Sequence, residues 1–324
     1  MTKSTVKEQL ARFQPILAIL LMTAGLALAS ENFLTIDNGL NVLRQISINL
    51  CLSLGMTLII LSGGIDLSVG SVLAFSGAVA AGLLKNGLPL PYTDYALRIT
   101  VVGAVVGGIA AGAALGWFNG LMITSFRLPP FVATLGMLSI ARGLTRLWTG
   151  GFPITDLGAE FTSIGTGYWL GIPMPVWISA ALVAVFVLIT RRTRFGRYLY
   201  AVGGNQRAAR LSGLDVHRIK RRVYMLGGAM AGVAGLLATA RQNAADPTIG
   251  IGYELDSIAA VVIGGTSLSG GRGSVLGTVL GCLIIGVLKN GLVLLGVSPD
   301  WQLVVMGLVI LCAVAIDQFG RSDD

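Results

Sequence analysis

Asp66 is the residue whose type and surroundings point most directly to chemistry. It is the only acid between Asp37 and Asp94, and it stands between two long apolar runs in the stretch GGIDLSVGS, residues 63–71. An ionisable side chain in such surroundings can form part of a polar path or a gate, together with the hydroxyl of Ser68. The alternative is a helix cap, in which Asp66 or Ser68 accepts from free backbone N–H groups. The glycines before Asp66 place it in a turn, which favours the cap.

Enzyme motifs are absent from the sequence. It contains no HExxH, no GxSxG, no paired carboxylates on a helix face and no GxxxxGK[ST] phosphate loop. We therefore expect no catalytic residues, no cofactor and no ATP hydrolysis by this chain. LSGG occurs at 61–64 and 268–271, and we interpret both copies as coincidence because they lie beside apolar runs. The single histidine, His217, has no second histidine or cysteine nearby, so we expect no metal site.

The elements that position these residues are predicted to be membrane helices. The chain of 324 residues is 54% hydrophobic and only 12% charged, which lies outside the balance of a soluble domain. Continuous apolar stretches exclude the alternating pattern of a β-barrel. We predict an all-α polytopic membrane protein with about ten transmembrane helices, the shorter runs being tilted, interfacial or partly re-entrant. The runs without Asp, Glu, Lys or Arg are 13–30, 45–65, 67–84, 99–126, 128–141, 161–190, 223–240, 257–271, 273–288 and 301–316.

Basic residues fall mainly on one side of the predicted spans. If the N-terminus is inside and ten helices cross, 16 of the 23 basic residues lie in inside segments, ten of them between 191 and 222. Because loops rich in Lys and Arg stay in the cytoplasm, we predict that both termini are cytoplasmic. The net charge of +8 is then a topology signal that also favours contact with membrane lipid. No nucleic-acid partner is expected, since the charge is not spread over a soluble face.

The basic segment, residues 191–222, is the one sizeable cytoplasmic segment. Its sequence predicts a short helix from Asn205 to about Leu211, with Gly213 as the stop signal. One role for such a segment is to anchor the protein on anionic lipid head groups, and the other is to dock a cytoplasmic partner. Composition alone favours neither.

Glycine spacing predicts close helix packing. Glycines recur at every fourth position at Gly108, Gly112, Gly116 and Gly120, and again at Gly273, Gly277 and Gly281. Small residues at this spacing let another backbone approach, either within one subunit, which we favour, or across a dimer interface. Two glycine-rich turns, GGIDLSVGSVL at 63–73 and GGTSLSGGRGSVL at 264–276, look alike and hint at an internal repeat with broken helices at corresponding places.

Four stretches of the chain carry a family resemblance. They are GGIDLSVGS at 63–71, PPFVATLGM at 129–137, TRFGRYLYAVGGNQRAARLSGL at 193–214 and GYELDSIAAVVIGGTSLSGGRG at 252–273. Together they resemble the permeases of the ribose, xylose and galactose group of ABC importers, and the match runs over nearly the whole chain. The third and fourth stretches are specific to that group.

The resemblance implies a function and a set of partners. It implies that residues 1–324 form one multi-pass permease domain of the bacterial inner membrane, which translocates a pentose or related monosaccharide. Implied partners are a cytoplasmic ABC ATPase, a periplasmic sugar-binding protein and a second permease, identical or related. One alternative is an ABC permease for another small polar solute. The other is a stand-alone secondary transporter, which would need intramembrane ionisable residues, and Asp66 is the only candidate.

The resemblance also implies that the basic segment couples the permease to the ATPase. The coupling residues expected on this basis are Gly204, Asn205, Gln206, Arg207, Ala208, Ala209 and Gly213. The acid that is usual in such loops would fall at Gln206 or Arg207, and neither residue is acidic. Ala208, Ala209 and Gly213 do fit the pattern of the loop.

Overall fold

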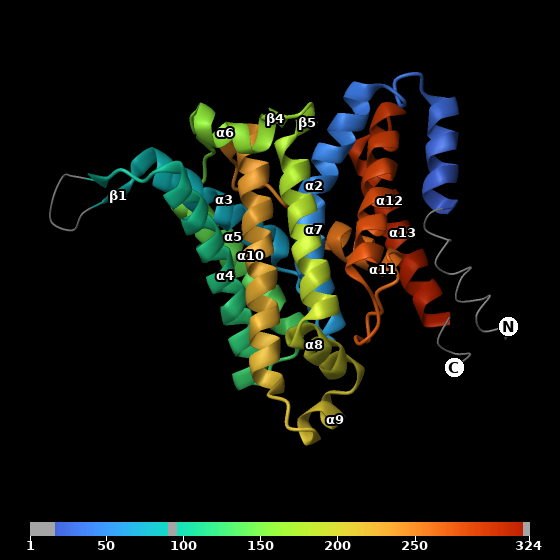
Figure 1. Ribbon diagram of the computed structural model, residues 1–324. Coiled ribbons are helices and arrows are strands. Elements are labelled where there is room, and N and C mark those ends of the chain that lie inside the picture. Colours follow the sequence, from blue (N-terminus) through green and yellow to red (C-terminus); the bar gives the residue numbers. More distant parts are fainter. Residues whose placement is uncertain (1–16, 90–95, 320–324) are drawn as a thin grey trace.

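The computed structural model describes residues 17–89 and 96–319, and it is almost entirely helical (Figure 1). An N-terminal helix, Leu17–Ala29, comes first. The helices that follow are α2 (Ile36–Leu61), α3 (Val69–Asn86), α4 (Val101–Ser125), α5 (Pro130–Thr149), α6 (Ala159–Thr166), α7 (Met174–Arg192), α8 (Arg194–Gly204), α9 (Gln206–Leu211), α10 (Val216–Gln242), α11 (Tyr253–Ile263), α12 (Val275–Leu294) and α13 (Pro299–Phe319).

Three short antiparallel strand pairs connect the helices. They are β1 (Leu88–Pro89) with β2 (Ala96–Leu97), β3 (Ile154–Thr155) with β6 (Ala244–Ala245), and β4 (Tyr168–Trp169) with β5 (Ile172–Pro173). In Figure 1 the β4–β5 hairpin and α6 lie at the upper end of the bundle, and α8 and α9 form its lower end.

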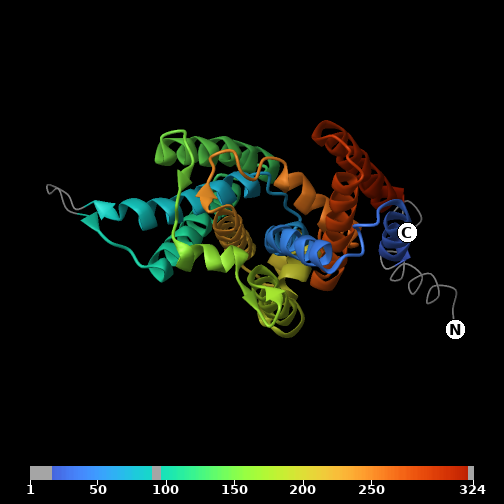
Figure 2. The same ribbon diagram turned by 90° about the horizontal axis from the view of Figure 1, so that it is seen from above.

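Helices α2 and α10 form the centre of the bundle. Seen from above, α12 and α13 lie on one side of α2, and α3, α4, α5 and α10 lie on the other (Figure 2). Helix α10 packs against α4, α2 and α3, and its residues from Val223 to Ala240 are mostly buried. Since α2 from Ile46 to Leu61 and α10 from Val223 to Ala240 are mostly apolar, these parts are suited to the interior of a helical membrane protein.

The glycine face of α4 packs against α10. A Cβ built on Gly116 would lie 2.9 Å from the Cα of Gly228, and one built on Gly112 would lie 3.2 Å from the Cα of Gly232. Any side chain there would enter the neighbouring backbone, which explains the small residues on both helices. The prediction that this glycine face packs within one subunit is therefore confirmed.

Six of the described helices are long and apolar enough to cross a membrane: α2, α3, α4, α7, α10 and α12. The helix Leu17–Ala29 and residues Pro299–Ala315 of α13 are apolar but shorter. The run 161–190 contains one helix that is long and apolar enough to cross a membrane, α7, and it is preceded by α6 and the β4–β5 hairpin. The expected cytoplasmic termini, residues 1–12 and Arg321, lie outside the described residues.

The run 257–271 does not form a full span. Helix α11 has 11 residues and ends at Ile263, so it is about 16 Å long, roughly half of the hydrocarbon thickness. Gly264 ends it and Gly265 follows with φ of +82°. The sequence left open whether this short run is a full span or a partly re-entrant segment. A full span is wrong, because the structure contains a half-length helix followed by a loop.

Candidate functional site

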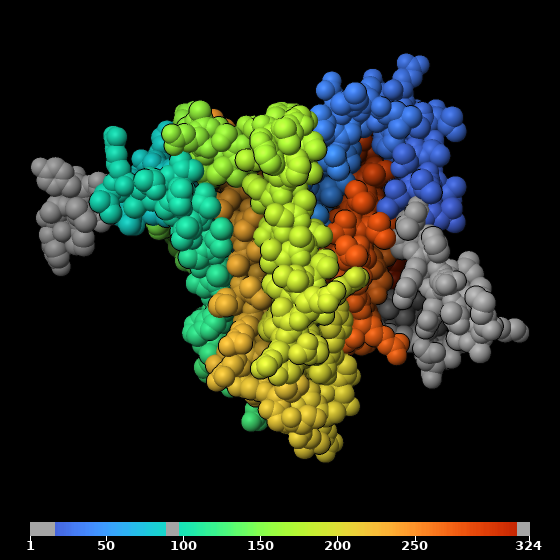
Figure 3. Space-filling view, in the orientation of Figure 1, coloured from blue at the N-terminus to red at the C-terminus, as the bar shows by residue number. Residues whose placement is uncertain are grey.

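The basic segment forms α8, α9 and the start of α10. The Thr193 hydroxyl accepts from the Gly196 N–H at 3.2 Å and begins α8, and the Asn205 Oδ1 accepts from the Ala208 N–H at 2.9 Å and begins α9. Gly213 follows α9 with φ of +82°. The predicted short helix with an N-terminal Asn205 and a glycine stop is confirmed. Figure 3 shows this yellow to gold part of the chain as the lower tip of the molecule.

Most of the expected coupling residues are on the surface of this tip. Gly204, Asn205, Gln206, Arg207, Ala208 and Gly213 are exposed, whereas Ala209 is buried. The Lys220 ammonium donates to Gln206 Oε1 at 3.1 Å and ties α9 to α10. One face of α9 is therefore held against the protein, and the opposite face is free within the described structure.

Asp215 fixes the start of α10. Its Oδ1 accepts from the Arg218 N–H at 2.9 Å, and its Oδ2 lies 3.5 Å from Arg218 Nε. The backbone hydrogen bond, together with the positive charges of Arg218 and Arg221, lowers the pKa of Asp215 below its usual value. The carboxylate thus stays ionised at neutral pH and caps α10, whose first turns carry Arg218, Lys220, Arg221 and Arg222.

Three stretches distant in sequence meet just above this tip. The Gly271 N–H donates to the Leu61 carbonyl oxygen at 3.0 Å, and the Tyr200 hydroxyl of α8 donates to the Gly273 carbonyl oxygen at 3.0 Å. We call residues 61–64, 203–204 and 270–273 the glycine junction. It joins the end of α2, the end of α8 and the loop that connects α11 to α12.

Glycine is required at two positions of the junction, Gly63 and Gly270. Gly63 and Gly270 have φ of +74° and +86°, in the left-handed region that side chains disfavour. A Cβ built on Gly270 would lie 2.8 Å from the Gly63 nitrogen and 3.0 Å from the Gly203 carbonyl oxygen. The two look-alike turns of the sequence are therefore in direct backbone contact, and the basic segment touches both.

Asp66 and Ser68 lie together beside the start of α3. Asp66 Oδ1 accepts from the Ser68 N–H at 2.8 Å and from the Ser68 hydroxyl at 2.6 Å. Asn119 of α4 donates to the Ser68 hydroxyl at 3.0 Å, and Tyr224 of α10 donates to the Ile65 carbonyl oxygen at 3.3 Å. Ser68, at the N-terminal cap position of α3, makes no capping hydrogen bond, and Asp66 accepts only from the Ser68 N–H just before the helix, so the predicted side-chain cap on α3 itself is not formed.

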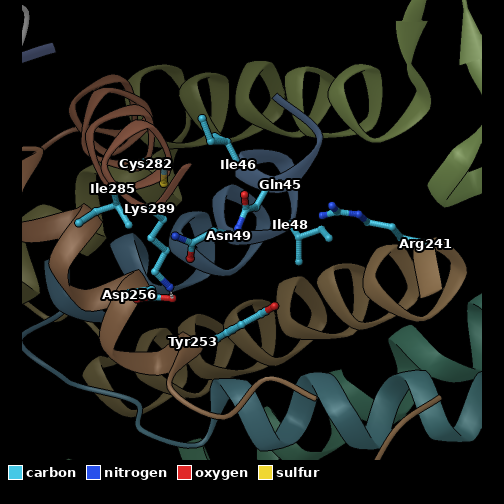
Figure 4. A pocket seen from close by; sticks show the side chains of 11 residues that line it. Gln45, Ile46, Ile48, Asn49, Arg241, Tyr253, Asp256, Cys282, Ile285 and Lys289 are labelled. Atoms are coloured by element: carbon cyan, nitrogen blue, oxygen red, sulfur yellow. Dashed lines mark hydrogen bonds and ion pairs between the residues drawn. The ribbon is translucent and has the colours of Figure 1, made fainter. Parts of the chain in front are cut away.

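A polar cavity lies among α2, α10, α11 and α12 (Figure 4). Lys289 of α12 forms an ion pair with Asp256 of α11, and Asp256 is only 7% exposed. Asn49 is midway along α2, and its side chain points toward the pair. The cavity is lined by Gln45, Ile46, Ile48, Asn49, Arg241, Tyr253, Asp256, Cys282, Ile285, Gly286 and Lys289.

This cavity is not among the predictions made from the sequence, although the sequence contains one signal of the ion pair in it. Asp256 directly precedes the run 257–271, and Lys289 directly follows the run 273–288. If two successive apolar runs are antiparallel, the start of the first and the end of the second lie at the same end. An acid and a base in these places can therefore meet, as they do here.

Comparison with known proteins places the chain in a transport family. The family described as "Branched-chain amino acid transport system / permease component" matches residues 38–314. The ribose import permease of Escherichia coli is 44% identical over 320 residues, which cover 98% of this chain and 95% of the relative. The ribose import permease of Bacillus subtilis is 47% identical over 307 residues, covering 94% and 92%.

A third relative carries a different sugar in its name. The D-allose transport system permease protein of Escherichia coli is 40% identical over 303 residues, 94% of this chain and 90% of the relative. No solved structure matches the chain at a significant level. The resemblance found in the four sequence stretches is confirmed, and the chain belongs to this family of permease components of ABC transport systems.

Proposed function

We propose that this chain passes a pentose or a related monosaccharide across the bacterial inner membrane as the permease subunit of an ATP-driven importer. One observation carries the proposal: the similarity to two ribose import permeases extends over at least 94% of this chain and 92% of each relative. The similarity to the allose permease supports a sugar as the solute and leaves the individual sugar open.

Coupling to a cytoplasmic ATPase is assigned to the basic segment. Two features support this assignment. The exposed face of α9, with Gln206, Arg207 and Ala208, protrudes from the bundle. The glycine junction then connects the end of α8 by backbone contacts to the end of α2 and to the loop between α11 and α12. Movement of α8 against a partner would be transmitted to these helices, because close-packed backbones cannot absorb a displacement.

The proposed topology has ten membrane segments in a single permease domain of residues 1–324, with both termini cytoplasmic. In its support, α2 and α7 run from the upper to the lower end of the bundle in Figure 1, whereas α10 runs from the lower end, after α9, to the upper end. The helices assigned to the ten segments are Leu17–Ala29, α2, α3, α4, α5, α7, α10, α11, α12 and α13. The tip with α8 and α9 carries the dense group of basic residues, which favours the cytoplasmic side for that end.

The proposed assembly contains the permease twice, as a homodimer or with a related subunit, together with a periplasmic sugar-binding protein. Membership of an importer family supports these partners. The second candidate function is import of another small polar solute, which the name of the matching family favours. A stand-alone secondary transporter is the remaining alternative.

A solute panel tests the proposed substrate. The permease, its ATPase and its binding protein are reconstituted in liposomes, and uptake of labelled ribose, allose, arabinose and leucine is measured with ATP on the ATPase side. We expect uptake of at least one of the sugars and none of leucine. Uptake of leucine and of none of the sugars would mean that the transported solute is an amino acid.

A further inference from the structure

We propose that Asn49, Asp256 and Lys289 form a binding site for a neutral polyhydroxylated solute in the polar cavity, on the path that the proposed function requires. The three residues come from α2, α11 and α12, and they line one continuous space (Figure 4). The inference rests on the proposed function because it names the residues that would contact the transported solute.

The ion pair provides both kinds of hydrogen-bonding group. Asp256 accepts, Lys289 donates, and the two side chains are in contact. Placing an isolated charge at membrane depth is costly, so such residues are usually paired and functional. Because the pair is neutral as a whole, it does not favour an ion. It does offer a donor and an acceptor side by side, the arrangement that adjacent hydroxyl groups of a polyol can bind.

Asn49 provides evidence for the binding site that is independent of the ion pair. Its Oδ1 is buried and has no hydrogen-bond partner among the described residues. A buried amide oxygen without a partner destabilises the protein unless water or a ligand satisfies it. Since the Asn49 side chain points into the cavity, a hydroxyl group of a bound solute would supply the missing donor.

The position and size of the cavity agree with a transport site. Asn49 is midway along α2, and the half-length helix α11 begins at the cavity with Tyr253. Discontinuous helices of this kind often surround solute sites near the midplane of transporters. The cavity has a volume of about 80 Å³, and since one water needs about 10–15 Å³, several waters fit. A polyol would replace these waters hydroxyl by hydroxyl.

A structural role for the same residues makes a different prediction. If the ion pair only joins α11 to α12, exchanging its members would restore it, and Asn49 would be dispensable. The Asn49→Leu variant separates the two roles, because replacing an unpartnered buried oxygen by an apolar group of similar size does not remove an internal hydrogen bond. Ser76→Ala is the matched control, since the Ser76 hydroxyl is also buried without a partner and lies outside the cavity.

The experiment uses the reconstituted importer with the sugar that the wild type takes up. We expect about a tenfold lower sugar uptake for Asn49→Leu, which corresponds to one lost hydrogen bond, with normal amounts of permease in the membrane. ATP hydrolysis stimulated by the loaded binding protein should stay within about twofold of the wild type. The exchange variant Asp256→Lys/Lys289→Asp should remain defective, and Ser76→Ala should transport normally.

Three results would overturn the inference. Normal sugar uptake by Asn49→Leu, or recovery of uptake in the exchange variant, would show that these residues have only a structural role while the proposed function stands. If the wild type takes up leucine and none of the sugars, both the proposed function and the polyol site fail. The wild-type measurement therefore distinguishes the two failures before any variant is made.

Discussion

Gly203 and Gly204 give two adjacent substitutions with opposite expected results. A Cβ built on Gly203 would fall on the Leu61 carbonyl group, 2.9 Å from its carbon, and 2.6 Å from the Gly271 nitrogen. A Cβ built on Gly204 would meet nothing within 4 Å. We therefore expect Gly203→Ala to disrupt the glycine junction and Gly204→Ala to leave it intact.

The magnitude follows from the atoms that must move. Overpacking a close contact costs about 1–3 kcal/mol. The two groups displaced are the donor and the acceptor of the bond from Gly271 to Leu61, and weakening this bond costs about 1 kcal/mol more. A total of about 2–4 kcal/mol corresponds to a change of about 30-fold or more in a conformational equilibrium.

The assay compares both variants in the thermal unfolding of purified permease and in sugar uptake by the reconstituted importer. Gly203→Ala should unfold several degrees lower and lose most of its uptake, whereas Gly204→Ala should unfold at the temperature of the wild type. Equal melting temperatures for the two variants would refute the close backbone contact of Gly203 with Leu61 and Gly271.

Three further predictions concern packing, capping and topology. Gly116→Leu should lower the amount of folded protein in membranes, measured by immunoblot, because α10 lies against this position. Gly136→Leu should accumulate normally, since no atom lies within 4 Å of a Cβ at that position, and equal amounts of the two variants would contradict the packing. Asn205→Ala should destabilise α9 by about 1 kcal/mol and so speed up hydrogen exchange of its backbone amides, whereas Asn205→Asp should keep the cap. Identical exchange rates in the two variants would contradict the capping role. A reporter active only in the cytoplasm should be active after Arg210 and silent after Asp156, and the reverse pattern would overturn the topology.

Local features of the fold were predictable from the sequence. Helix α9 was predicted from Asn205 and Gly213 because a capping side chain and a left-handed glycine act on their own neighbours. The membrane helices were predicted from runs without charged residues, since hydrocarbon imposes this composition directly. The packing of α4 followed from its glycine spacing, because only small residues permit such close contact.

Features that depend on tertiary packing were not predictable in this way. The run 257–271 has no charged residue, yet α11 ends at Ile263 where the loop to α12 turns through Gly264 and Gly265. Asp256 and Lys289 are 33 residues apart, so no local pattern pairs them, and only the antiparallel packing of α11 and α12 brings them together. The glycine junction likewise joins three segments whose meeting is set by the whole bundle.

The most direct test of the proposed ATP-driven import is whether sugar uptake depends on an ATPase bound at α9. Ala208 is exposed and lies outside every apolar run, so Ala208→Glu should leave the permease inserted while it blocks docking. Retention of the ATPase on washed membranes and sugar uptake are measured together for the wild type and this variant. Ala208→Glu should lose both the bound ATPase and the uptake. Continued sugar uptake by permease that carries no ATPase would contradict the proposed coupling, because the protein would then transport alone.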